Sequence, residues 1–200
     1  INPHFLYNTL DLINWISMDY GAEEIGTLTW NLARFYRLSL NHGKSLISIG
    51  EEVEHVEVYV NIENYHFDNA ISLEVDVPEE LKSYACLNII LQPFVENAIK
   101  YSFRGYEGAH RLTIEVSKAE EQMHIIIANN GRHIEEDQLK DLNMGKEIKN
   151  HFGISNVRKR LKLYYGEDAV IYFENVSPSG VKVHLFVPLQ EEQKDEDSSY

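Results

Sequence analysis

Apolar residues recur at helical spacing in the first forty positions of the chain. The spacing predicts one helix from Pro3 to about residue 18 and a second from Glu23 to about residue 41, with a turn at Asp19-Tyr20-Gly21 between them. Each helix carries a wide apolar stripe, which two antiparallel helices of this length cannot bury by themselves. We therefore expect two copies of the chain to pair their hairpins into a four-helix bundle.

After residue 50 the pattern mixes helical and strand periodicity. Strict alternation over residues 71–77 predicts a strand with one buried face. Four further strands are expected at 112–117, 123–128, 170–175 and 181–187, and helices at 51–65, 87–101 and 154–165. Because helices and strands do not alternate one by one, the pattern predicts an α+β fold in which helices pack on one face of a mixed sheet.

These segments divide the chain into three parts. A helical hairpin over 1–45 is followed by an α/β sandwich over 46–190, and the acidic tail 191–200 is expected to be disordered. Within the sandwich, the polar segment EEDQLKDLNMGKEIKN (135–150) is only weakly periodic and is typical of a mobile lid.

Composition and charge restrict the possible partners. The chain is 44% apolar and 25% charged, as in globular proteins, and its formal charge of −14 argues against nucleic acid or an anionic membrane surface as a partner. The single cysteine, Cys86, lies in an apolar run and is expected to be a buried, reduced thiol, which favours the cytosol.

The ends of the chain suggest a larger protein. No stretch approaches the roughly 20 apolar residues that a membrane span requires. The sequence nevertheless starts at Ile1 without an initiator methionine and inside an amphipathic pattern. We expect it to be part of a longer protein whose missing N-terminal portion could include membrane spans.

The segment LQPFVENAIKYS (91–102) places polar side chains along an apolar helix. Glu96, Asn97 and Lys100 lie at positions i, i+1 and i+4 of the expected helix. An amide oxygen is a good ligand for Mg²⁺, and a lysine one turn away could meet phosphate charge. The alternative is a polar helix face without a ligand.

Two glycine-containing segments complete this pattern. In ANNG (128–131), Gly131 follows a strand, where the backbone can approach a flat ligand closely. In FGISNVRKRL (152–161), Gly153 leads into a helix, and a helix N-terminus is a natural anion site. Each glycine alone is weak evidence, but the order of helix with asparagine, strand with glycine, polar lid and glycine before a helix is more specific.

At this point a family resemblance emerges. The order INPHFLYNTL, LQPFVENAIKYS, ANNG, FGISNVRKRLKLYYG and SGVKVHLFVP resembles the sensor histidine kinases of the LytS/YesM type, over essentially the whole chain up to Pro188. The resemblance implies a dimeric helical hairpin that carries the phosphoacceptor histidine, followed by a Bergerat-type (GHKL) ATPase domain. It also implies ATP and Mg²⁺ as cofactors and a response regulator as partner.

The resemblance assigns roles to particular positions. His4 is the implied phosphoacceptor, Asn97 the Mg²⁺ ligand, and Gly180 belongs to the last glycine box. The Asn130-Gly131 turn would face adenine. The implied nucleotide-binding residues are Asn97, Lys100, Tyr101, Asn129, Asn130, Gly131, Gly153, Ile154, Asn156 and Gly180.

His4 suits this role chemically. A neutral imidazole is a nucleophile, and with an ordinary pKa near 6.5 most of it is neutral at cytosolic pH. Asn8 and Asp11, one and two turns further along, share its helix face and could orient the ring; the alternative is a solvated polar face. Without the rest of the pattern, His4 would be interpreted simply as a histidine at a helix start.

The sequence departs from the family pattern in the first glycine box. That pattern is Asp-Asn-Gly-x-Gly, with the aspartate accepting a hydrogen bond from adenine, whereas this chain has Asn129 and His133 at the first and last positions. A neutral amide and a bulkier residue there predict weaker ATP binding.

A second departure concerns the general base. Pro93 stands where related ATPases that use water carry a glutamate acting as general base, which favours transfer to histidine over hydrolysis. The general base, if one is needed, is left unassigned, and Glu96 is a candidate for it.

We therefore predict that ATP phosphorylates His4 and that a response-regulator aspartate takes the phosphoryl group, with the full-length protein in a bacterial cell membrane. One alternative is a degenerate, weakly or non-ATP-binding dimeric scaffold. Another is a stand-alone ATPase, which Pro93 and the hairpin argue against.

Overall fold

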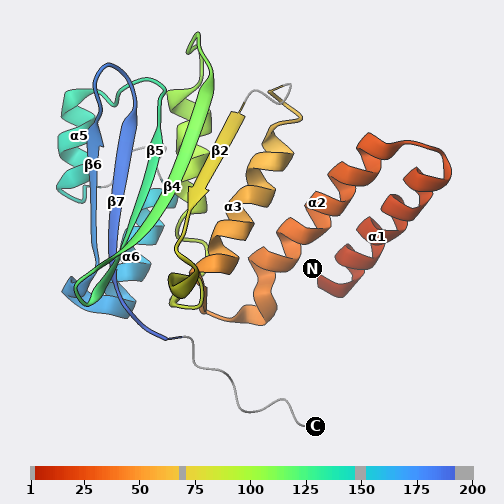
Figure 1. Cartoon of the computed structure of the whole chain (residues 1–200), viewed down its shortest axis with the longest axis horizontal. Helices are drawn as coiled ribbons and strands as arrows, with labels where there is room; N and C mark the ends of the chain where they lie inside the picture. The colour runs from red at the N-terminus through yellow and green to blue at the C-terminus, as the bar shows by residue number, and fades with distance from the viewer. Residues whose placement is uncertain (1–2, 68–70, 147–151, 192–200) are drawn as a thin grey trace.

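The computed structural model describes residues 3–67, 71–146 and 152–191 (Figure 1). The predicted disordered tail lies almost entirely outside these residues, as does the end of the predicted lid. Within the described part, no helix has both the length and the apolar character needed to cross a bilayer.

The first two helices form the predicted hairpin. Helix α1 (Pro3–Asp19) packs antiparallel to α2 (Glu23–Leu40). A 3₁₀ turn, η1 (Asn41–Gly43), follows α2 and ends the hairpin. Leu10 is buried between the helices, whereas other apolar side chains of α1 face outward. The hairpin stands to one side of the sheet and contacts the remainder of the molecule through α2 and α3 (Ile49–Glu63) (Figure 1).

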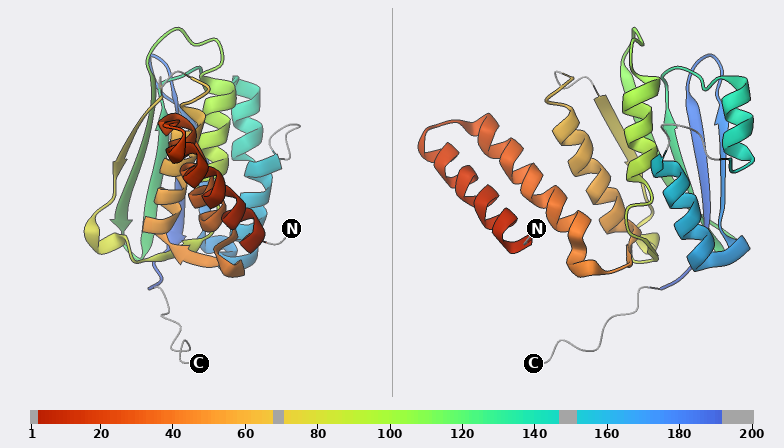
Figure 2. Two further views of the ribbon diagram at one scale, coloured as in Figure 1. Left: turned by 90° about the vertical axis from the view of Figure 1, so that its right-hand side faces the viewer. Right: turned by 180° about the vertical axis from the view of Figure 1, so that it is seen from behind.

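The main body has one mixed sheet with helices on a single face, which confirms the predicted α+β class (Figure 2). The strand order is β2-β4-β5-β7-β6; the first pair is parallel and the other pairs are antiparallel. The strands are β2 (Ile71–Asp76), β4 (His110–Ala119), β5 (Gln122–Asn129), β6 (Val170–Asn175) and β7 (Val181–Pro188). Helices α3, α4 (Gln92–Asn97) and α6 (Phe152–Tyr165) cover the sheet, and α5 (Glu136–Asn143) lies beside β6 (Figure 1).

Several short elements were not predicted. Strands β1 (Leu46–Ser48) and β3 (Ala85–Leu87) form a separate antiparallel pair. Helix α5 occupies the segment expected to be a lid, and single 3₁₀ turns, η2 (Glu79–Leu81) and η4 (Gly166–Asp168), precede β3 and β6. Each of these elements has only three to eight residues, too few to give a clear period.

The helix predicted over 87–101 was wrong at its start. Leu87 ends β3, and α4 begins only at Gln92, with Pro93 in its first turn, where a missing N–H costs nothing. The helix then continues as a π-helical turn, η3 (Ala98–Ser102). The apolar run over 85–91 is buried because it forms a strand and a turn in the core.

The joint between the hairpin and the main body, formed where α2 packs on α3, is partly polar. His55 on α3 is buried, its Nε2 lies 2.8 Å from the Ser39 hydroxyl of α2, and its ring stacks on Phe35. Burial lowers the pKa of His55 to about 4, so this histidine is neutral at physiological pH. At the rim of the joint, Arg34 and Glu54 form a half-exposed ion pair of 2.6 Å.

A buried carboxylate orders the turn before α4. Glu52 on α3 is fully buried, and its two oxygens accept hydrogen bonds from the backbone N–H groups of Ile89, Ile90 and Leu91 at 2.7–2.8 Å. Burial raises the pKa of Glu52, while the three N–H donors and Arg160 oppose that rise. The carboxylate thus satisfies two N–H donors of the turn and that of Leu91, the N-cap residue of α4, which no helical carbonyl can reach.

The carbonyl side of the same turn is held by a cation. Arg160 on α6 donates from Nη2 to the carbonyl of Asn88 at 2.5 Å and from Nη1 to that of Ile89 at 3.3 Å. Ile89 has a φ of 56°, a conformation that a β-branched residue rarely adopts. Two charged side chains from separate helices thus stabilise a strained turn.

We expect Glu52→Gln to lower the free energy of unfolding by roughly 2–3 kcal/mol, because an amide NH₂ would face a backbone N–H. Urea unfolding followed by circular dichroism measures the change. Glu54→Gln is the matched control on the same helix and should cost less than about 1 kcal/mol, as is usual for exposed ion pairs. Equal effects of the two substitutions would contradict the role given to Glu52.

Candidate functional site

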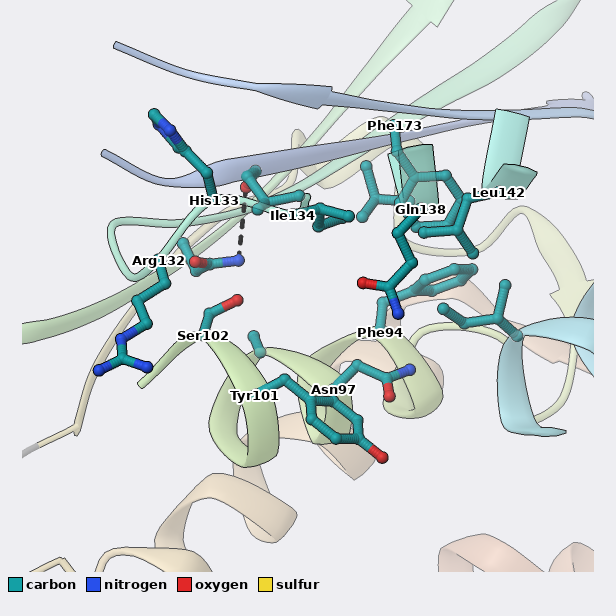
Figure 3. A pocket seen from close by; sticks show the side chains of 15 residues that line it. Phe94, Asn97, Tyr101, Ser102, Arg132, His133, Ile134, Gln138, Leu142 and Phe173 are labelled. Carbon is teal, nitrogen blue, oxygen red and sulfur yellow. Dashed lines mark hydrogen bonds between the residues drawn. The ribbon is translucent and has the colours of Figure 1, made fainter. Parts of the chain in front are cut away.

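A cavity of about 210 Å³ lies between the sheet and the helices that cover it (Figure 3). Its lining combines apolar side chains from the sheet and helices with a few amides and hydroxyls, as in many small-molecule sites. The lining residues are Phe94, Asn97, Ala98, Tyr101, Ser102, Asn129, Arg132, His133, Ile134, Gln138, Leu142, Ile154, Phe173, Val181 and Val183.

Asn97, the predicted metal ligand, lines this cavity from the last residue of α4. Its Nδ2 donates to the carbonyl of Pro93 at 2.6 Å. Because a carbonyl can only accept, this bond fixes which end of the amide is nitrogen and leaves Oδ1 as the atom available to a cation. The donor set therefore fits Mg²⁺, with the other ligands supplied by phosphates and water.

Asn129 lines the cavity at the end of β5, where it closes a small turn. Its Oδ1 accepts the N–H of Gly131 at 3.0 Å, and its Nδ2 lies 3.5 Å from the carbonyl of Val181. The amide oxygen is thus already engaged with the backbone. A carboxylate at this position would have more lone pairs with which to bind both the backbone and a ligand.

The Asn130 side chain is not among the cavity-lining residues, although Asn129 and Arg132 on either side of its turn are. Its Oδ1 accepts the N–H of Arg111 at 2.8 Å, and its Nδ2 donates to the carbonyl of Ala109 at 2.6 Å. Asn130 therefore braces the start of β4 against the turn that follows β5.

Gly131 and Gly180 are required by close backbone contacts rather than as cavity lining. A Cβ atom on Gly131 would lie 2.5 Å from the carbonyl oxygen of Ser102, and one on Gly180 would lie 2.3 Å from that of Asn129. Gly180 also has a φ of 121°, which favours glycine. Both glycines let the backbone around the cavity close up.

The remaining predicted site residues divide into two groups. Tyr101 and Ile154 line the cavity, as Asn97 and Asn129 do. Gly153 instead packs the first turn of α6 against Pro93, whose Cβ would lie 3.1 Å from a Cβ placed on the glycine. Asn156 is exposed on α6 and is not among the lining residues.

Lys100 and Glu96 face a different hollow. Both border a second depression beside α3 that is lined by Tyr59 and Phe103, among others. Glu96 accepts a hydrogen bond of 2.6 Å from Gln92. Since neither side chain lines the cavity that contains Asn97, the geometry does not support Glu96 as a base or Lys100 as a phosphate ligand there.

Several lining residues were missed by the sequence analysis. Ser102 belongs to the π-helical turn, and Gln138 reaches across from α5 toward the helix that carries Asn97 (Figure 3). His133, which the sequence analysis named as a departure from the family pattern, donates from Nε2 to the carbonyl of Val176 at 2.8 Å and lacks the positive φ that would strain it. The alternation of β6 and β7 could have identified Phe173, Val181 and Val183, because these residues share the inner face of the sheet.

His4 lies on exposed α1, on a different element from every residue of the cavity lining. The Asn8 amide lies 3.3 Å from Nδ1 of His4, so it does contact the imidazole. Asp11 instead faces Arg37 across the hairpin, at 3.7 Å. Of the two residues proposed to orient His4, only Asn8 is placed to do so.

Comparison with known families now identifies the architecture. Residues 85–191 match the family described as "Histidine kinase-, DNA gyrase B-, and HSP90-like ATPase", and residues 1–71 match the family "Histidine kinase". The chain is a sensor histidine kinase region of the LytS/YesM type. In this family context, the cavity around Asn97 corresponds to the ATPase part and the hairpin to the histidine-kinase part.

Similar proteins agree with this assignment. The chain is 29% identical to Sensor histidine kinase YesM of Bacillus subtilis over 96% of its length, and 26% identical to Sensor protein LytS of Enterococcus faecalis over 98%. It spans about a third of the length of each of these relatives, 32% and 34% respectively.

Solved structures share the fold of the histidine kinase region. The catalytic domain of histidine kinase ThkA superposes with a TM-score of 0.54 at 19% sequence identity. The match covers 74% of this chain and 97% of the ThkA chain. Histidine kinase AdeS of Acinetobacter baumannii, at 16% identity, has a TM-score of 0.54 and covers 94% of this chain and 95% of its own.

Proposed function

We propose that this region transfers the γ-phosphoryl group of ATP to His4 and then to an aspartate of a response regulator. The observation that carries the proposal is the combination of Asn97 in an amide-containing cavity with an exposed histidine on a separate helical hairpin. Residues 46–190 would bind the nucleotide, and residues 1–45 would accept the phosphoryl group. The described cavity residues Asn97, Tyr101, Asn129 and Ile154 are the expected nucleotide contacts.

Asn97 would hold Mg²⁺ through Oδ1, since its Nδ2 is occupied by Pro93. Bound Mg²⁺ would neutralise phosphate charge and position the transferred group, which is most of what phosphoryl transfer requires. The apolar lining formed by Phe94, Ile154 and Phe173 would exclude water from the part of the site that holds the adenine ring.

Asn8 would set the tautomer of His4. In the structure the Asn8 Nδ2 group faces Nδ1 of His4 at 3.3 Å, which makes Nδ1 the acceptor. With the amide reversed, its oxygen would accept the Nδ1 N–H and Nε2 would be the nucleophile. Nε2 would attack the γ-phosphorus as the bond to ADP breaks, and the imidazole would then lose its Nδ1 proton to water. In the second step an aspartate carboxylate of the regulator would attack phosphorus as the N–P bond breaks, and the leaving imidazole would regain a proton from water at Nδ1.

The hairpin supports a dimer as part of this function. Large apolar side chains of α1 and α2 face outward, among them Phe5 and Trp15, each 69% exposed. Burying these side chains against a second hairpin would remove a continuous apolar surface from water. Because the chain spans about a third of its longer sensor relatives, the whole protein would add a sensor part, expected to lie in a bacterial cell membrane.

A second candidate function is a dimeric signalling scaffold with little turnover. The observation that favours it is the engagement of Asn129 Oδ1 with Gly131, which leaves a neutral and already bonded group where the family pattern has an aspartate. ATP affinity and phosphate incorporation distinguish the scaffold from the kinase.

The kinase proposal predicts that the chain incorporates label from γ-labelled ATP and Mg²⁺, as acid-labile, base-stable phosphohistidine. His4→Gln and Asn97→Ala should each abolish the label, because they remove the acceptor and the metal ligand. His66→Gln alters an exposed histidine and should retain it. Full labelling of the His4 variant would overturn the assignment, and lack of label in the parent at saturating ATP would favour the scaffold.

For Asn129→Asp we expect ATP to bind about tenfold more tightly, since a carboxylate can keep the Gly131 contact and also accept from the adenine amino group. Calorimetric titration with ATP and Mg²⁺ measures this. Asn61→Asp makes the same chemical change on the exposed part of α3 and should leave the affinity unchanged. An unchanged affinity in the Asn129 variant would show that its neutral amide is not limiting.

Light scattering should show a dimer for the parent chain and a monomer for Trp15→Glu, which places a charge on the outward face of α1. Leu163→Glu is the control, because Leu163 is 87% exposed on α6, outside the hairpin. A monomeric parent at tens of micromolar, or a Trp15 variant that remains dimeric, would exclude the hairpin as the dimer interface.

A further inference from the structure

Gln138 lines the candidate nucleotide cavity from α5, the helix that occupies the first part of the predicted lid. Its side chain is half-buried and points into the cavity, toward Asn97 on the opposite wall (Figure 3). Leu142 is the other residue of α5 in the lining, so Gln138 is the polar group that this helix contributes. The proposed phosphotransfer gives this amide no role.

Two side-chain amides clamp α5 onto the edge strand β6. Before the helix, Asn175 donates from Nδ2 to the carbonyl of Ile134 at 2.8 Å and accepts its N–H at 2.9 Å. At the end of the helix, Asn143 donates from Nδ2 to the carbonyl of Phe173 at 2.9 Å and accepts its N–H at 2.7 Å. Because each amide uses both of its ends, α5 cannot slide along β6 without breaking these paired hydrogen bonds.

Helix α6 holds α5 from another side. Arg158 donates from Nη2 to the carbonyl of Leu142 at 2.9 Å, and the Leu142 side chain is buried in the core. The first part of the predicted lid is therefore a fixed wall of the cavity. A side chain on such a wall binds a ligand with little loss of backbone entropy, because the backbone is already ordered.

The charges of this wall select against phosphate as the group that Gln138 binds. Glu135, Glu136 and Asp137 precede it directly, and Lys140 is the basic residue of α5. Phosphate groups are bound by cationic side chains, metal ions and backbone N–H groups, whereas Gln138 is neutral. A side-chain amide offers an acceptor oxygen and an NH₂ donor, which suit neutral hydroxyl groups.

We propose that Gln138 binds the sugar hydroxyls of the nucleotide and makes the site selective for ribonucleotides. This inference rests on the proposed function, in which the base meets Asn129 and the phosphates meet Mg²⁺ on Asn97. The sugar links these two parts covalently, so it crosses the cavity between them, where Gln138 faces Asn97. The amide oxygen accepts a hydrogen bond from one hydroxyl, and the amide N–H donates to the oxygen of the other.

The sugar contact gains weight because the base contact is weakened. Oδ1 of Asn129 already accepts the N–H of Gly131, and its amide is neutral where the family pattern has an aspartate. Fewer hydrogen bonds are then available to the base, and those made to the sugar supply a larger share of the affinity. Removing the sugar hydroxyls should consequently weaken binding to a measurable extent.

The test is a calorimetric titration of the whole 200-residue chain with ATP and, separately, with 2′,3′-dideoxy-ATP, both with Mg²⁺. We expect the parent to bind ATP about tenfold more tightly than the analogue, which lacks both hydroxyls. Gln138→Leu removes the amide but keeps a side chain of similar size. It should lower the affinity for ATP to that for the analogue and leave the affinity for the analogue unchanged, which also shows that the variant is folded.

Lys140→Leu is the matched control, because it places the same side chain at an exposed position of α5. It removes a charge, which affects both nucleotides alike, so the ratio of the two affinities should stay at the parent value. A parent-like ratio in Gln138→Leu, or an equal loss of both nucleotides, would overturn the role of Gln138 and leave the proposed function standing. Absence of ATP binding by the parent at millimolar concentration would overturn both.

Discussion

The buried carboxylate of Glu52 is the interaction on which the arrangement of the site depends. It binds three consecutive backbone N–H groups, and Arg160 binds the carbonyls on the other side of the same turn. A charge this deeply buried is tolerated only when its hydrogen bonds are complete, so α3, the turn and α6 are held in one relative position. Helix α4 begins directly after that turn and carries Asn97 five residues on from its own start. The position of Asn97 is therefore set by a buried side chain that does not itself line the cavity.

The sheet serves two different surfaces with the same strands. On β7, Val181 and Val183 face the cavity, whereas His184 and Phe186 face outward. Since a strand alternates its side chains, any shift of β7 moves both sets together. The hairpin is connected more loosely: it meets the body through α2 and α3, where Ser39, His55 and Phe35 provide the buried contact. His4 and Asn97 thus belong to two parts joined along the α2–α3 contact, which suits the proposed transfer from nucleotide to His4.

Sequence periodicity predicted the long elements well and the short ones poorly. The hairpin, β2 and the four later strands were identified because each has enough residues to show its period. The start of α4 was missed because Glu52 is distant in sequence from the residues it binds, and no local pattern reports such a contact. Of the residues predicted to bind nucleotide, Asn97, Tyr101, Asn129 and Ile154 line the cavity. Asn130, Gly131 and Gly180 proved instead to shape its backbone. A sequence motif therefore locates the residues in and around the cavity. It does not tell which of them line the cavity and which only shape the backbone beside it.

The π-helical turn η3 also limits how this segment can evolve. A π turn has one residue more than an α turn, so removing one residue from 98–102 would restore regular helical hydrogen bonding. The same deletion would rotate everything after it by about 100°. Ser102 would then no longer present its carbonyl to the N–H of Arg132, a bond of 2.9 Å that ties the helix to the glycine turn. Length in this stretch is consequently constrained even where side-chain identity is not, and single-residue insertions or deletions should be far less tolerated here than substitutions.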